Sequence, residues 1–155
     1  MSVSLMVQAC GLGAALVALS VIDLRRQVLP DALTFPLLVF GLFVAMTYQP
    51  DEVADRLLAV CLGWLGFAML SAWYRRRRGV EGLGAGDARL LAAAGAWVGP
   101  MGLPWVVLLA ALGGIAAVAV MRRRQGWETD RRLPFGPFLS AALFAVWLWM
   151  SSAPT

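Results

Sequence analysis

Long apolar runs separated by short polar connections make up most of this chain. A helix needs about 20 apolar residues to cross roughly 30 Å of hydrocarbon. Each run is apolar around its whole circumference, as is typical of helices that face both lipid and neighbouring helices. Hydrocarbon holds no water to hydrogen-bond with free backbone groups, so a segment at this depth is expected to be helical. We therefore predict an all-α, polytopic transmembrane helical bundle of about six spans, near residues 4–22, 31–48, 56–74, 87–99, 103–121 and 136–152.

The composition agrees with a membrane protein. Of the 155 residues, 61% are hydrophobic and 14% are charged, and the mean hydropathy is +0.76, which leaves too little polar surface to coat a water-soluble globule. The first run lacks a cationic start and a cleavage site, so we expect a retained span and not a signal peptide. Residues 1–155 are expected to form a single transmembrane domain, in which small residues such as Gly63 and Gly66 let helices approach closely.

The arginines predict an orientation. All 13 basic residues are arginines, and eleven of them fall in three connections, at 25–26, at 75–78 and between 122 and 132. Because loops rich in basic residues stay in the cytoplasm, we expect these connections to be cytoplasmic and both termini to be extracytoplasmic. The alternate connections agree, since YQPDEVADR carries three acids against one arginine and GPMG carries no charge. This topology explains the basic runs without a nucleic-acid partner.

Two aspartates stand at the ends of apolar runs on the predicted cytoplasmic side. Asp23 closes the first run and Asp87 opens the fourth. A charged aspartate at the centre of a spanning helix costs roughly 2.5–3.5 kcal/mol, so acids persist at such depth mainly where they have a function. As a helix, the fourth run from Asp87 to Gly99 is about 20 Å long, shorter than the hydrocarbon is thick. We therefore expect Asp87 to lie below the membrane surface.

Glycines precede the second of these acids in the segment EGLGAGDARLLAAAGAWVG, residues 81–99. Gly84 and Gly86 allow tight backbone and close approach by another chain, and they deliver Asp87 to a helix N-terminus. Two carboxyls brought together would share a proton, the arrangement by which an acid/base pair activates water against an amide. The residues alone leave a second interpretation open, in which Asp23 is an interfacial acid paired with arginine and Asp87 is an N-cap.

The missing residue types narrow the chemistry. The chain has no histidine and no lysine, which excludes serine–histidine and serine–lysine proteases and histidine-ligated metalloproteases. Cys10 and Cys61 lie inside apolar runs, where they form neither a zinc site nor a disulfide framework. We expect no metal and no cofactor. Among membrane hydrolases, aspartates remain as the catalytic groups.

The segments IDLRRQVLPDALTFPLL, GLGAGDARLLAAAGAWVG and, at 133–140, LPFGPFLS occur in this order across nearly the whole chain. The second resembles the GxGD segment of the type IV prepilin leader peptidases, a family of aspartyl membrane proteases. The first is similar to the segment with that family's first catalytic aspartate, and the third to the stretch that opens its last helix. Together the three matches are specific, whereas GxGD alone would be weak.

The resemblance implies a role for the matched residues. It makes Asp23 and Asp87 the catalytic pair. The other matched residues, which would bind substrate or support the structure, are Asp31, Glu81, Gly84, Gly86, Arg89, Pro134 and Gly136. Asp31 is expected to be an N-terminal acid of its helix that satisfies free amides. Arg89 stands where the family usually has lysine, and a guanidinium does not replace an ammonium in detail, so its role and that of Glu81 stay open.

Longer members of the family carry a preceding zinc-binding segment associated with methylation, and we expect this protein to have no such segment. It resembles the short, peptidase-only members. The implied substrate is a prepilin in the cytoplasmic membrane of a prokaryote, with a short basic leader in the cytoplasm and an apolar helix in the lipid bilayer, cut after a glycine at the boundary. The lipoprotein signal peptidases are similar in length, but their asparagine–aspartate motifs are missing here. The other alternative is a small transporter or pilus-assembly subunit that uses Asp23 and Asp87 as a proton or ion site.

Overall fold

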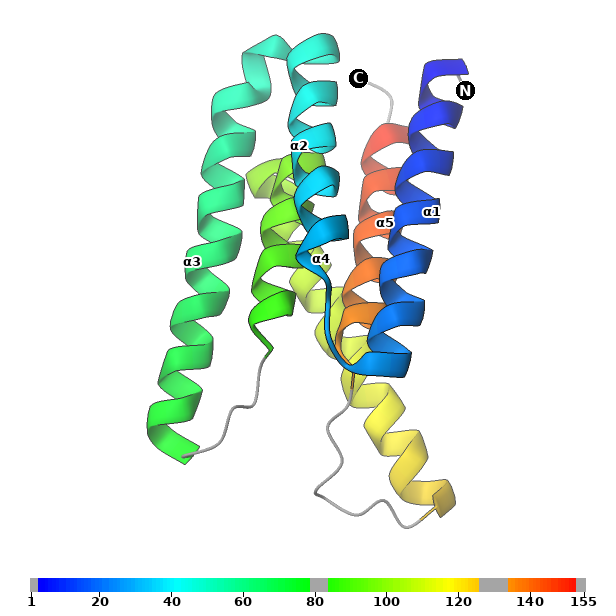
Figure 1. Cartoon of the computed structure of the whole chain (residues 1–155), viewed down its shortest axis with the longest axis vertical. Helices are drawn as coiled ribbons and strands as arrows, with labels where there is room; N and C mark the ends of the chain where they lie inside the picture. The colour runs from blue at the N-terminus through cyan, green and yellow to red at the C-terminus, as the bar shows by residue number, and fades with distance from the viewer. Residues whose placement is uncertain (1–2, 79–83, 126–133, 153–155) are drawn as a thin grey trace.

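The computed structural model describes residues 3–78, 84–125 and 134–152, and in these ranges the chain is helical apart from short connections. Figure 1 shows the helices packed side by side as an elongated bundle. The elements are α1 (Val3–Arg26), α2 (Asp31–Tyr48), a short 3-10 helix η1 (Pro50–Glu52), α3 (Val53–Arg78), α4 (Ala85–Gln125) and α5 (Gly136–Ser152).

Four helical segments are long and apolar enough to cross a membrane. They are Leu5–Arg26, Asp31–Tyr48, Pro50–Arg77 and Ala85–Arg123, and Gly136–Ser152 is a shorter apolar helix. The prediction of an all-α protein with membrane-spanning helices is therefore confirmed. The first run extends further than expected, because α1 continues to Arg26. Asp23 consequently lies within the last turn of the helix.

Helix α4 contains a break at Gly99. The backbone there has φ 65° and ψ −173°, a left-handed φ that favours glycine because other residues clash through their Cβ. Figure 1 shows that the two halves of α4 run in opposite directions on either side of this turn. Pro100 opens the second half, in its first turn, where proline is tolerated, and Pro104 lies one turn further along. The halves correspond to the separate runs predicted at 87–99 and 103–121.

Small residues pack α3 tightly against the first half of α4. A Cβ atom on Gly63 would lie 2.8 Å from the carbonyl oxygen of Leu91, and one on Gly95 would lie 2.6 Å from the backbone of Ala59. Such close backbone approach is possible only where side chains are missing. The first half of α4, which carries Asp87 in its first turn, is therefore fixed against its neighbour along much of its length.

A buried arginine holds the other end of that half-helix. Nη1 of Arg56, on α3, donates to the carbonyl oxygens of Ala96 at 3.1 Å and Trp97 at 2.6 Å. These carbonyls come just before the break at Gly99, so the helix cannot satisfy them all with its own amides. Nε1 of Trp97 in turn donates to the carbonyl of Leu37 at 3.0 Å, which ties α4 to α2.

The chain termini and the arginines lie at opposite ends of the bundle. Figure 1 places both termini at the upper end of the view. The lower end holds the last turn of α1 with Arg25 and Arg26, the last turns of α3 with Arg75, Arg76 and Arg77, and the end of α4 with Arg122 and Arg123. The arginine-rich segments are thus gathered at one end of the molecule.

Candidate active site

Asp23 lies on the buried stripe of α1. Leu12, Leu16 and Leu19 are nearly inaccessible, and their spacing of four and three residues marks one helix face. Asp23 follows at the next step of four and is only 5% exposed. The helix ends just beyond it, where Gln27 adopts a positive φ of 51° and donates its backbone N–H to the carbonyl of Asp23 at 2.8 Å. The carboxyl is therefore directed into the bundle.

The N-terminus of α5 contacts this carboxyl group. The backbone N–H of Gly136, the first residue of α5, donates to Oδ2 of Asp23 at 3.0 Å. A Cβ atom at position 136 would lie 2.6 Å from the same oxygen, so glycine is required for the contact. The free amides and the positive end of the helix dipole favour a carboxylate at such a place.

Asp87 occupies the first turn of α4 and is 9% exposed. Its backbone N–H donates to the carbonyl of Gly84 at 3.1 Å, and its carboxyl accepts a hydrogen bond from the backbone of Gly84. A Cβ atom on Gly86 would come within 2.7 Å of the side chain of Leu29. The second glycine of the motif therefore lets the connection between α1 and α2 pack directly against the N-terminus of α4.

The two carboxyl groups lie within range of direct electrostatic interaction. They come from α1 and α4, 64 positions apart in the sequence, and both are buried. Two carboxyls held together in a site with little water can share one proton, so that one acts as a base on water and the other as an acid toward a leaving nitrogen. The described residues include no group of three or more histidine, cysteine or acidic side chains that could hold a metal ion.

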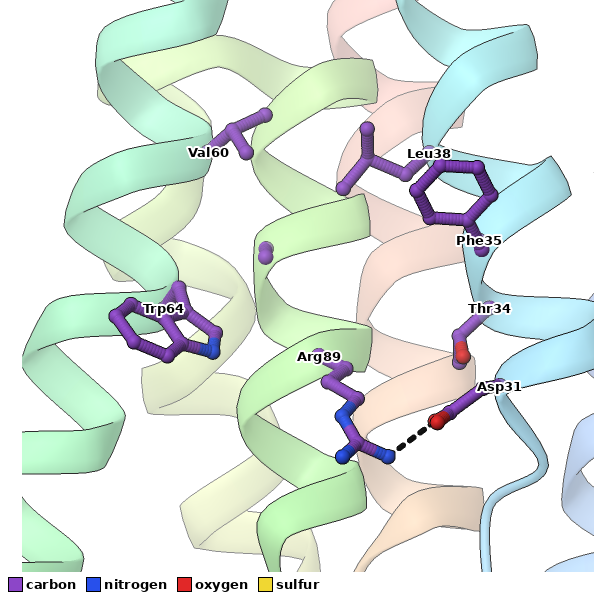
Figure 2. Close-up of a pocket in the computed structure, with 8 residues that line it drawn as sticks. Asp31, Thr34, Phe35, Leu38, Val60, Trp64 and Arg89 are labelled. Carbon is purple, nitrogen blue, oxygen red and sulfur yellow. Dashed lines mark hydrogen bonds and ion pairs between the residues drawn. The ribbon is translucent and has the colours of Figure 1, made fainter.

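Arg89 points to a different side of α4 from Asp87, and there it contacts Asp31 of α2. Asp31 is the first residue of α2, and its carboxylate forms an ion pair with Arg89, with side chains 64% and 48% exposed. Because Arg89 follows Asp87 by two residues, the two side chains point about 200° apart around the helix. The pair borders a cavity of about 340 Å³ between α2, α3 and α4 (Figure 2). Asp31 is thus an acid in the first turn of α2, and its carboxylate also contacts Arg89, a partner that the sequence did not predict.

The remaining predicted residues are placed as follows. Pro134 precedes α5 in the connection that leads to Gly136, and Glu81 lies outside the described residues. Sequence reasoning missed Leu29, which is 6% exposed and packs beneath Gly86. No specific signal in the sequence pointed to it, because Leu29 is one of two adjacent apolar residues in the connection before α2 and its contact is with the distant α4.

Comparison with known proteins gives several matches. Residues 10–119 match the type IV leader peptidase family. The chain is 43% identical over 133 residues to a prepilin leader peptidase/N-methyltransferase of Burkholderia pseudomallei, covering 86% of this chain and 43% of that protein. It is 38% identical over 136 residues to a protein of the same description from Xanthomonas campestris, covering 86% of this chain and 47% of that protein.

A shorter relative is covered more fully. The chain is 44% identical over 125 residues to the leader peptidase HopD of Escherichia coli, covering 80% of this chain and 81% of that protein. By contrast, it spans less than half the length of the two longer relatives. No solved structure matches the chain significantly.

Proposed function

Because this chain belongs to the type IV leader peptidase family, we propose that it is a membrane-embedded aspartyl endopeptidase that removes the leader of type IV prepilins or prepilin-like proteins. The observation that carries the proposal is the pairing of two buried carboxyls, Asp23 and Asp87, at the end of the bundle where the arginines gather. The proposal also draws on the names of the relatives, each of which is a leader peptidase.

The proposed reaction is hydrolysis of one peptide bond. One carboxylate removes a proton from a water molecule, whose oxygen then attacks the carbonyl carbon of the scissile bond. The other carboxyl donates its proton to the nitrogen as the carbon–nitrogen bond breaks. One water is consumed, and the products are a shortened protein and a free leader peptide. Gly84 and Gly136, which donate hydrogen bonds to the two carboxyls, would keep the pair oriented during this exchange.

We further propose a topology of six membrane passes, with the halves of α4 counted separately and both termini outside the cytoplasm. The gathering of Arg25, Arg75 and Arg122 at one end of the bundle supports it, because basic residues are retained in the cytoplasm. The catalytic pair would then face the cytoplasmic side of the inner membrane. A basic leader in the cytoplasm and an apolar segment in the membrane would place the scissile bond at this level.

Cleavage by the purified protein tests the proposal. The protein in detergent is mixed with a prepilin that has a basic leader, and mass spectrometry follows the new N-terminus. We expect one product, cut after the glycine at the boundary of leader and apolar segment. Asp51→Asn is the control variant, because Asp51 is an exposed acid of η1 far along the chain from both motifs. An unchanged prepilin, together with proton or ion uptake by vesicles that contain the protein, would favour a transporter.

A further inference from the structure

An apolar groove lies across the start of α4 from the proposed catalytic pair and has no role in the reaction just described. We propose that this groove binds the first turns of the substrate's apolar segment as a helix, with its N-terminal end facing the carboxylate of Asp31. The inference rests on the proposed function, since it names the part of the prepilin that docks there. The groove is defined by residues of α2, α3 and α4: Asp31, Thr34, Phe35, Leu38, Val60, Trp64, Arg89 and Ala92.

The groove has one polar end and an apolar body. Figure 2 shows Asp31 and Arg89 together at the lower end, with Phe35, Leu38 and Val60 above them. From Asp31 to Leu38 the groove rises by about 10 Å along α2, at 1.5 Å per residue. Its volume of about 340 Å³ suits apolar side chains that a helix presents from one face, the usual way in which a helix docks in a groove.

The polar end lies at the depth of the catalytic pair. Arg89 is two residues beyond Asp87, about 3 Å along the axis of α4, and Asp31 is two residues beyond Leu29, which packs against Gly86. A substrate bound in the groove would therefore leave it at the depth of Asp23 and Asp87. Its path to the carboxyls would cross the start of α4, where Gly84 is exposed.

The charge of Asp31 fits the proposed occupant. A helix has four backbone N–H groups without partners at its N-terminus, together with the positive end of its dipole. A carboxylate at the mouth of the groove would accept hydrogen bonds from those amides. Among the described residues at the arginine-bearing end, Asp31 is also the exposed acid, because Asp23 and Asp87 are buried. It is thus the exposed carboxylate that a basic leader continuing from the helix would meet, and the leader would compete there with Arg89, its partner in the ion pair.

Kinetics of two matched variants test the apolar wall of the groove. Phe35→Ala removes an apolar wall whose side chain is 68% exposed, and Phe43→Ala removes a side chain that is 62% exposed on the same helix but outside the groove. We expect Phe35→Ala to raise KM about tenfold, as for a buried aromatic contact at an interface, with kcat little changed. Phe43→Ala should match the wild type.

The charge at the mouth is tested in the same way. Asp31→Lys should raise KM roughly tenfold or more, since it places a like charge at the dipole and leader. Asp31→Glu should restore most of the affinity, and Asp51→Lys is the control at the other end of the bundle. A merely structural ion pair would instead lower kcat or the yield of folded protein. Unchanged KM in both Phe35→Ala and Asp31→Lys would overturn the inference.

A crosslinking measurement separates docking from catalysis. Phe35 or Phe43 is replaced by p-benzoylphenylalanine in an Asp87→Asn background, and each protein is reconstituted in phospholipid vesicles with a synthetic prepilin peptide. We expect irradiation to link position 35, and not position 43, to residues just after the glycine of the cleavage site. This readout stands even if the wild type cleaves nothing, which would refute only the proposed function. Crosslinks from position 35 to phospholipid alone, or to a second copy of this chain alone, would overturn the docking site.

Discussion

The backbone N–H of Gly136 lies 3.0 Å from Oδ2 of Asp23, although 113 positions separate the two residues in the sequence. This contact joins the end of α1 to the start of α5 at the buried carboxyl. It gives the third sequence motif a physical purpose, because the start of α5 supplies a hydrogen-bond donor to one member of the proposed catalytic pair. The glycine is required by the space that the carboxylate occupies.

Gly136→Ala should therefore lower activity without unfolding the bundle. The new Cβ would lie 2.6 Å from Oδ2 of Asp23, so the carboxyl must move, and a displacement of about 1 Å in a catalytic group can cost roughly 10²-fold in rate. Alanine is otherwise a good residue for a helix. Measurement of kcat together with thermal unfolding in detergent checks this. Gly11→Ala, which meets no atom within 4 Å, is the control, and equal activity of the two variants would refute the prediction.

The glycines between α3 and α4 should control stability. In Gly63→Ala and Gly95→Ala the added methyl would meet the backbone of Leu91 or Ala59 at 2.8 Å or less. Overpacking of this kind typically costs about 1–3 kcal/mol, so both variants should unfold at lower temperature. Gly66→Ala, on α3 like Gly63, has open space around it and should be neutral or slightly stabilising. If all three variants unfold alike, the close packing of α3 on α4 is wrong.

Arg56→Met should loosen the turn at Gly99. It removes the donors to the carbonyls of Ala96 and Trp97, and a buried carbonyl left unpaired costs about 1–3 kcal/mol. We expect a lower midpoint of thermal unfolding in detergent, with a smaller decrease for Arg56→Lys, which retains a donor. A midpoint equal to that of the wild type in Arg56→Met would show that these hydrogen bonds contribute nothing to stability.

Chelation should leave cleavage unaffected. The chain contains no histidine and two cysteines. Both cysteines are exposed and unpaired. Because the proposed reaction uses carboxyl groups alone, activity should be the same with and without EDTA. Loss of activity in EDTA that added zinc restores would point to a different mechanism.

The helices could be predicted from the sequence, and Asp23 and Asp87 could be singled out as acids at the ends of apolar runs, because both signals are local. Apolar runs of membrane-spanning length indicate helices wherever they occur, and a buried acid such as Asp23 stands out against them. Even the break at Gly99 has a local signal, since Gly99 and Pro100 interrupt an otherwise apolar segment.

The contacts between segments had no such signal. Gly63 and Gly66 look equivalent in the sequence, yet Gly63 is buried against the backbone of Leu91 whereas Gly66 is exposed and would meet no atom within 4 Å. In the same way, the pairing of Asp31 with Arg89 depends on how α2 and α4 are placed. The helix-terminal position of Asp31 could be predicted from the sequence, whereas its guanidinium partner comes from the tertiary arrangement.

The measurement that tests the central claim most directly is the cleavage rate of Asp23→Asn, Asp87→Asn and the double variant. Asparagine keeps the shape of aspartate but can neither hold nor take the proton, so each single variant should lose about 10²–10⁴-fold in kcat. Because residues that act as one unit are strongly non-additive, the double variant should be no worse than either single one. Wild-type turnover by Asp23→Asn, with all three proteins inserted and folded, would contradict the account.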